Sequence, residues 1–143
     1  MTIMSARRTS AKMQLPVASE DTEQICLMRW ARASSAAMPE LKMLVHIANE
    51  RKCTPAQGQR LREMGVRKGM PDLFLFVPRG SYHGLAVEMK RTRGGVVSDE
   101  QREMLAALEA MGYAASVARG WEQASDIISD YICGGDRWRE YRA

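Results

Sequence analysis

The sequence predicts one α/β domain, a mixed central sheet flanked by helices in the order αβαββαβα. Three observations support this prediction. Short apolar runs rich in strand formers alternate with longer runs of helical spacing. Proline, glycine and capping residues separate these runs. The chain has 143 residues, of which 45% are hydrophobic, so it can bury one core and has no length for a second domain.

The first part of the chain predicts a helix and a strand. Residues 1–14 are polar and basic without periodicity, and we expect a disordered arm there. Ser19 can cap a helix whose first turn is acidic and which ends before Pro39. The run 41–49 predicts the first strand, with alternate residues on opposite faces.

Two capping boxes predict the starts of two further helices. Thr54 and Gln57 start a short helix that stops at Gly65. Ser98 and Gln101 start another, which ends at Gly112 and carries apolar residues at helical spacing. The remaining elements are strands at 73–77, 85–90 and 113–118 and a last helix at 121–132.

These elements place the folded domain at residues 15–133, followed by a basic, aromatic tail at 134–143 that we expect beyond the fold. The chain shows no signal-peptide pattern and no membrane-length apolar run, which predicts a soluble protein of the cytosol without membrane partners. The cysteines lack metal-ligand spacing, so we expect them reduced and not bound to zinc; they are Cys26, Cys53 and Cys133.

Charged residues stand at the ends of two neighbouring apolar strands. Asp72 directly precedes the strand 73–77, whereas Glu88 and Lys90 end the strand 85–90 and point to the same face. If the two strands form a hairpin with Val77 opposite Leu85, Asp72 lies level with Lys90 and diagonal to Glu88. Buried charges need partners, so the cluster predicts a bound cation, mutual pairing or both.

The spacing of these charges resembles a nuclease signature. "PDL" at 71–73 followed by "EMK" at 88–90 resembles the PD...(D/E)-x-K pattern. More specifically, "SEDTEQ", "GMPDLFLF", "GLAVEMKR", "SDEQ", "GY" and "GW" occur in the order typical of the virus-type replication-repair nuclease (VRR-NUC) family. The resemblance spans 19–131 and implies a restriction-endonuclease-like fold. The family element after the first strand is here "ANERK", without its proline and glycine, which puts a role of Asn49 in doubt.

Two carboxylates are the ligands that suit Mg²⁺, which keeps several waters and favours oxygen donors. Asp72 and Glu88 are therefore the expected metal ligands, with Mn²⁺ as a substitute metal, and Lys90 is expected beside the attacking water. The resemblance adds the backbone carbonyl of Met89 to the metal shell. It also implies site roles for two further residues, Glu20, in contact with the metal through water, and Gln101.

Both of these residues also have a purely structural interpretation. Acids in the first turn of a helix favour the helix dipole, and Glu23, one turn after Glu20, is the rival for its role. Gln101 is by default a capping-box residue.

The resemblance implies a Mg²⁺-dependent DNA endonuclease, structure-selective for branched or four-way-junction (Holliday) DNA and not sequence-specific. Alternatives are a sequence-specific restriction-type nuclease and a DNA-binding assembly subunit with a vestigial site. Stand-alone members of such families often work as homodimers on branched DNA, and the expected location is bacterial or phage-infected host cytosol. The net charge of +4 suits an anionic partner, and basic residues flank the proposed site, namely Arg60, Arg62, Arg67, Lys68, Arg91 and Arg93.

Overall fold

The computed structural model describes residues 15–48 and 53–143. The arm expected at 1–14 and Asn49 lie outside this range. The elements are α1 (Glu20–Ser34), a 3₁₀ helix η1 (Pro39–Met43), β1 (Leu44–His46), α2 (Pro55–Glu63), β2 (Leu73–Leu75), β3 (Leu85–Lys90), α3 (Asp99–Ala110), β4 (Ala114–Arg119), α4 (Trp121–Ile132) and a second 3₁₀ helix η2 (Arg137–Tyr141). In this part of the chain no helix is long and apolar enough to cross a membrane, and the three cysteines are free.

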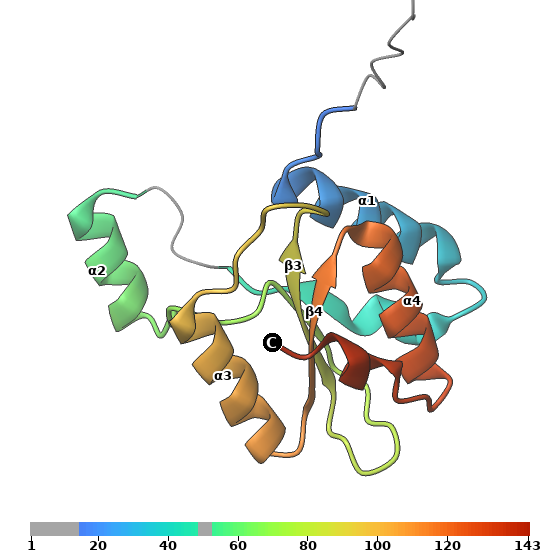
Figure 1. Ribbon diagram of the computed structural model, residues 1–143. Coiled ribbons are helices and arrows are strands. Elements are labelled where there is room, and N and C mark those ends of the chain that lie inside the picture. Colours follow the sequence, from blue (N-terminus) through green and yellow to red (C-terminus); the bar gives the residue numbers. More distant parts are fainter. Residues whose placement is uncertain (1–14, 49–52) are drawn as a thin grey trace, which may run out of the picture.

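The four strands form one mixed sheet in the order β1-β2-β3-β4. β2 runs antiparallel to both of its neighbours, β1 and β3, and β4 is parallel to β3 after the crossover through α3. Helices α1 and α4 pack on one face around Leu27 and Ile127, while α3 packs on the other around Leu105 (Figure 1). The predicted mixed sheet with helices on both faces is therefore confirmed. Helix α2 stands apart from both layers (Figure 1).

The prediction of a strand over 41–49 is wrong in its first half. Pro39 begins a 3₁₀ turn, and the strand proper is only Leu44–His46. Leu41 and Leu44 are both buried, and their spacing of three residues suits a 3₁₀ turn, which places i and i+3 on the same side. Met43 and Val45 are exposed, whereas Leu44 is buried.

The predicted hairpin register is also wrong, by two residues. Leu75 lies opposite Leu85, and Leu73 lies opposite Val87. The residues after Leu75 leave the ladder because Pro78 has no N–H to donate and Arg79 pairs with Tyr82 in a bridge of its own. A shift of two residues keeps every side chain on its predicted face. It changes the neighbours, so Asp72 faces Glu88 directly instead of Lys90.

The C-terminal segment is part of the core, contrary to the prediction of a tail beyond the fold. Its 3₁₀ helix returns to β4, and Trp138 is 1% exposed. The indole meets the Tyr82 ring edge-on at 5.0 Å, and the guanidinium groups of Arg139 and Arg142 lie over it. Burial of this large aromatic ring stabilises the packing of the C-terminal segment on the rest of the domain. Trp138 is therefore unavailable for an interface with a second copy of the chain.

Candidate active site

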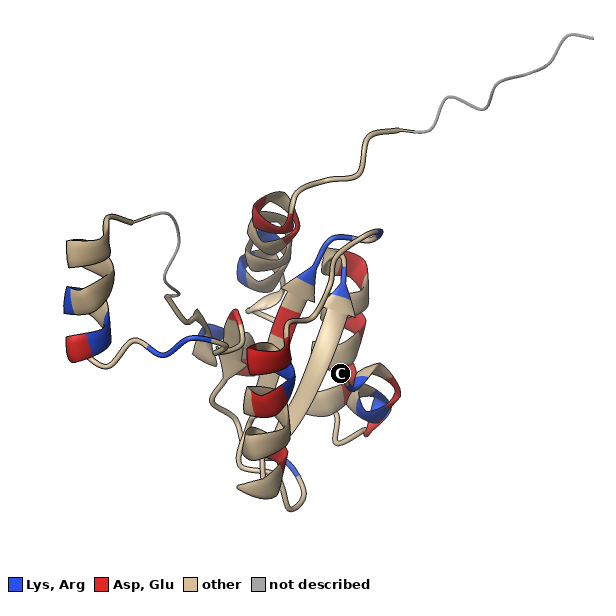
Figure 2. Ribbon diagram, turned by 60° about the vertical axis from the view of Figure 1, so that its left-hand side comes forward, with Lys and Arg blue, Asp and Glu red and all other residues tan. Residues whose placement is uncertain are grey.

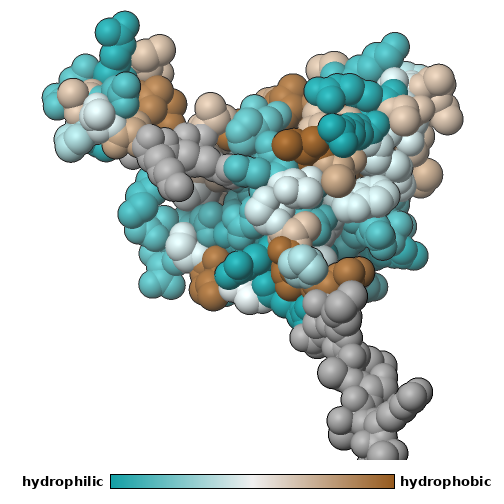
Figure 3. All heavy atoms as spheres, turned by 90° about the horizontal axis from the view of Figure 1, so that it is seen from above, coloured by the Kyte–Doolittle hydropathy of each residue, from teal (hydrophilic) through white to brown (hydrophobic). Residues whose placement is uncertain are grey.

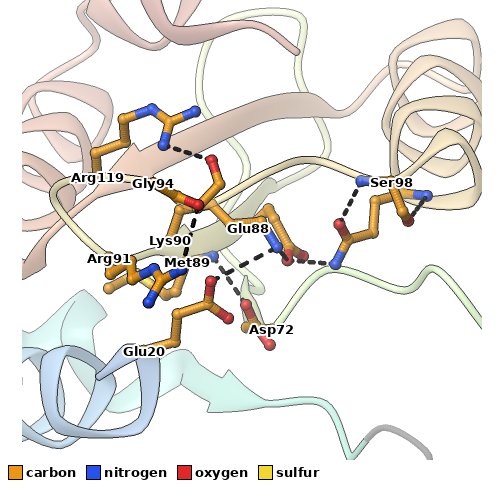
Figure 4. Close-up of polar contacts among 11 residues, drawn as sticks. Glu20, Asp72, Glu88, Met89, Lys90, Arg91, Gly94, Ser98 and Arg119 are labelled. Atoms are coloured by element: carbon orange, nitrogen blue, oxygen red, sulfur yellow. Dashed lines mark hydrogen bonds and ion pairs between the residues drawn. The ribbon is translucent and has the colours of Figure 1, made fainter.

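The charged residues singled out from the sequence meet at one end of the sheet, on the face covered by α3 (Figure 4). Asp72 precedes β2, and Glu88 and Lys90 end β3. All three are buried, with exposed fractions of 4%, 2% and 5%. Buried ionisable groups are costly unless they are paired or bind an ion. This end of the sheet is therefore the candidate active site.

One oxygen of Glu88 is fully used, and the other is not. Oε1 accepts a hydrogen bond from Gln101 Nε2 at 2.6 Å and lies 3.1 Å from Lys90 Nζ. Oε2 is buried and has no hydrogen-bond partner among the described residues. A buried carboxylate oxygen without a partner costs about 1–3 kcal/mol or more, so such an atom calls for a ligand. A hard cation is the ligand that suits it.

The charge state of Glu88 follows from the same surroundings. Burial and, second to it, the negative charge of Asp72 raise the pKa of Glu88 from 4.5 to about 7, although Lys90 acts in the opposite direction. Without a cation, the site therefore holds a carboxylate that is only partly ionised near neutral pH. A divalent ion would favour the ionised form.

Asp72 is held in place by its neighbours on both sides. Its Oδ2 accepts the backbone N–H of Met89 at 2.8 Å. Its carbonyl oxygen accepts the N–H of Ile47 at 2.8 Å and the ring Nδ1–H of His46 at 2.7 Å. Sequence reasoning missed His46, because an isolated histidine in a strand carries no motif and only the pairing of β1 with β2 brings it to this carbonyl.

Gln101 makes the predicted cap contacts and also contacts Glu88 in the candidate site. Its Oε1 accepts the Ser98 N–H at 2.9 Å, and the Ser98 hydroxyl accepts the Gln101 N–H, which completes the predicted capping box. The amide nitrogen of the same side chain donates to Glu88. The helix cap therefore directs a donor into the site, since the cap and the Glu88 contact use opposite ends of one amide group.

The structure separates the two acids of the first helix that competed for a site role. Glu20 Oε1 lies 3.9 Å from Lys90 Nζ at the rim of the site. Glu23 is buried and accepts the backbone N–H of Trp121 at 2.7 Å. It takes the place of a side-chain cap for α4, whose N-cap residue is Gly120. Glu20 is thus brought to the site, and Glu23 to the start of another helix.

This separation predicts different results for two substitutions. Glu23→Gln is expected to lower the free energy of unfolding by about 1–2 kcal/mol, because a charge-assisted hydrogen bond to a buried helix end is weakened. Glu20→Gln should leave stability within about 0.5 kcal/mol, since the carboxylate is at the surface. Urea denaturation measures both, and the reverse ranking would contradict the placement of these acids.

Among the described residues, no three His, Cys, Asp or Glu side chains form a complete metal cage. A pair of carboxylates with room for water is nevertheless the set that Mg²⁺ prefers. Asp72 and Glu88, with the unpartnered Glu88 Oε2, fit such an ion.

Comparisons with known proteins place the chain in a family. The family model of the VRR-NUC domain matches residues 17–122. The chain belongs to the VRR-NUC family. A solved structure described as "VRR_NUC domain protein" is 30% identical, covers 85% of this chain and 94% of its own, and superposes with a TM-score of 0.73. A comparison with curated proteins gives no match.

Membership of the VRR-NUC family confirms the resemblance and the fold expected from the sequence. A VRR-NUC domain is a nuclease domain of the PD-(D/E)xK type, so the chain is a hydrolase that binds DNA. Nucleases of this type generally use divalent metals. In this chain the signature corresponds to Asp72, Glu88 and Lys90, which the fold brings together although fifteen residues lie between Asp72 and Glu88.

Proposed function

We propose that the chain is a Mg²⁺-dependent endodeoxyribonuclease that hydrolyses phosphodiester bonds, with a preference for branched or four-way-junction DNA and none for sequence. The observation that supports it most is the buried Oε2 of Glu88, which has no hydrogen-bond partner among the described residues, whereas Oε1 of the same carboxylate contacts Lys90 and Gln101. The cytosol of a bacterial or phage-infected cell is the proposed location.

The residues that would hold the ion are Asp72, Glu88, the backbone carbonyl of Met89 and, through water, Glu20. Their hard oxygen donors suit Mg²⁺, and Mn²⁺ would substitute. When bound, the metal supplies a water of lowered pKa and an electrophile for the phosphate. Gln101 keeps Glu88 aimed into the site by donating to its Oε1.

Lys90 supplies a fixed positive charge. Its side chain is 7% exposed, and its ammonium group lies 3.1 Å from Glu88 Oε1 and 3.9 Å from Glu20 Oε1. A preorganised cation in a buried site stabilises the negative charge that develops on the phosphate without reorganisation during the reaction. The same charge favours deprotonation of a nearby water molecule. Lys90 is thus the proposed partner of the attacking water.

The surface around the site suits a DNA backbone. Basic residues mark the ends of β3 and β4 and the loop that follows β3 (Figure 2). The end of the molecule that carries the site is mainly hydrophilic, with its hydrophobic atoms in separate small patches (Figure 3). The exposed basic residues of the loop that follows β3 include Arg91 and Arg93. Contacts of this kind bind phosphates and position the DNA without reading its sequence.

The proposed nuclease works as a homodimer, because one site cuts one strand and a junction or duplex needs two cuts. Exposed apolar residues lie at the open edge of the sheet, where β1 could pair with β1 of a second copy, namely Met43, Val45 and Phe76. Light scattering should give about twice the chain mass of 16.1 kDa for the wild type. Val45→Glu should give the mass of one chain, and a wild-type monomer that cuts only one strand contradicts the dimer.

A cleavage panel tests the proposed activity. Single-stranded, duplex, flap and four-way-junction DNA are incubated with Mg²⁺, Mn²⁺ or EDTA, and each structure is made in two unrelated sequences. Cleavage of branched DNA with either metal, none with EDTA and equal rates for both sequences is expected. A strong preference for one sequence would favour the restriction-type nuclease. DNA binding without cleavage of any substrate would favour the assembly subunit.

A further inference from the structure

We propose that Arg119 is a positioning residue for Lys90, and that it acts through the backbone of Gly95. This inference rests on the proposed function, because it concerns the lysine of the same site. Arg119 ends β4 and is paired with Lys90 across the parallel strands, so both side chains leave the sheet on the face covered by α3. The guanidinium reaches towards the loop that follows β3 (Figure 4).

The loop between β3 and α3 lies against the Lys90 side chain. A Cβ atom added to Gly95 would stand 3.1 Å from Lys90 Cβ and 3.3 Å from its Cδ. It would also stand 3.4 Å from Glu20 Oε1. The backbone of Gly95 is therefore packed directly on the aliphatic stem of the lysine. Even one methyl group at this position would force the loop or the lysine to move.

Arg119 ties this part of the loop to the end of the sheet. Its Nη1 donates to the Gly95 carbonyl oxygen at 2.8 Å. The backbone N–H of Arg119 donates to Gln123 Oε1 at 2.7 Å, which anchors the strand end to the first turn of α4. The Gly120 N–H donates to the Lys90 carbonyl oxygen at 2.9 Å, so the backbone of Lys90 is held at the same corner.

A lysine needs such a support more than most residues. Its stem has four rotatable bonds, and its ammonium must stay near Glu88 Oε1 to act as a fixed charge. A displacement of about 1 Å can cost up to about a hundredfold in rate. The hydrogen bond to Gly95 lies at the surface and adds little to global stability. The role of Arg119 is therefore to position the Lys90 side chain, and not to stabilise the whole fold.

Chemical labelling of Lys90 tests the inference without metal or DNA. The full chain is treated with an amine-acylating reagent, and the rate at Lys90 is measured by mass spectrometry relative to exposed Lys42. In Arg119→Met, and separately in Gly95→Ala, Lys90 should react at least about fivefold faster than in the wild type, because the loop opens locally. Arg119→Lys, which can still donate to the carbonyl, should restore slow labelling.

Arg102→Met is the matched control, because Arg102 lines the same surface pocket from α3. It removes the same charge and should leave Lys90 labelling unchanged. Unchanged labelling in both Arg119→Met and Gly95→Ala would overturn the proposal. If Arg119→Met does not fold, the Gly95→Ala result decides alone. Changed labelling in a chain that cuts no DNA would support the positioning role and contradict only the proposed nuclease activity.

Kinetics provide the second test. Arg119→Met should lower kcat about ten- to hundredfold with KM within about twofold, because the loss lies in the reacting geometry. The double variant with Gly95→Ala should lose no more than the worse single variant, as expected for residues that act as a unit. A raised KM with unchanged kcat, together with a weaker salt dependence of DNA binding, would instead make Arg119 a phosphate contact and overturn the proposal.

Discussion

Replacing Asp72 with Asn, Glu88 with Gln or Lys90 with Ala is expected to lower the cleavage rate at least about a thousandfold. The two carboxylate changes remove oxygen donors for the metal, and the lysine change removes the fixed charge beside the phosphate. DNA binding should persist, because exposed basic residues outside the site contact the backbone. Single-turnover cleavage of a junction substrate measures the rate, and a gel-shift assay without metal measures binding.

A matched pair of control residues lies close by on the surface. Lys68 Nζ is 2.9 Å from Glu100 Oε1, and the two side chains are 77% and 47% exposed. Glu100→Gln repeats the loss of a carboxylate at the first turn of α3 without touching Glu88 and should keep cleavage within about threefold of the wild type, because exposed ion pairs contribute little. Lys68→Ala removes a basic residue that flanks the site, so it should weaken DNA binding and leave the rate of single-turnover cleavage at saturating protein within about threefold of the wild type. Near wild-type cleavage by any one of the three site variants would remove that residue from the mechanism.

Binding of Mg²⁺ is expected to strengthen steeply between pH 6 and pH 8. The pKa of Glu88 is raised to about 7 by burial and by Asp72, so the folded protein without metal favours the protonated carboxyl. The protonated Glu88 side chain therefore contributes to the stability of the folded protein. This contribution is present in full below pH 4.5, the pKa of Glu88 in the unfolded chain, and is lost as the pH rises through 7. The metal needs the ionised carboxylate, so its affinity should fall about tenfold for each pH unit below 7.

Thermal unfolding at increasing Mg²⁺ concentration measures this linkage. The rise in Tm caused by a fixed Mg²⁺ concentration should be small at pH 6 and largest at pH 8, with EDTA as the reference. Glu88→Gln is the control, because its amide does not ionise and the pH dependence should disappear. An equal shift of Tm at pH 6 and pH 8 in the wild type would show that Glu88 does not hold the metal.

Local signals in the sequence predicted the helix starts correctly. Ser19 caps α1, and the boxes of Thr54 with Gln57 and of Ser98 with Gln101 are formed as expected. These contacts join residues three apart, so they depend little on the rest of the chain. The strand at Leu85–Lys90 was also predicted to the residue, because an apolar run bounded by glycine and charge has few alternatives.

Long-range contacts were the ones that sequence reasoning missed. The spacing of Asp72 from Glu88 gave the signature but not the register, since the loop length and Pro78 decide which residues face each other. Nothing near Trp138 indicated burial, because its partners Tyr82 and β4 lie far away in the chain. In the sequence, Glu20 and Glu23 are equivalent candidates for a site role. Only the fold separates them, because it brings the chain that follows β4 beside Glu23.

The sequence by itself therefore determined the fold class, the family and the residue types of the site. Those follow from periodicity, from caps and from a motif whose spacing is written along the chain. Only the tertiary structure decided that Asp72 faces Glu88, that Glu88 Oε2 has no partner in the described part of the chain and that Glu23 caps α4. It also brought Arg119 to the loop over Lys90. The physical reason is that burial and pairing are properties of neighbours in space, which packing brings together from distant parts of the chain.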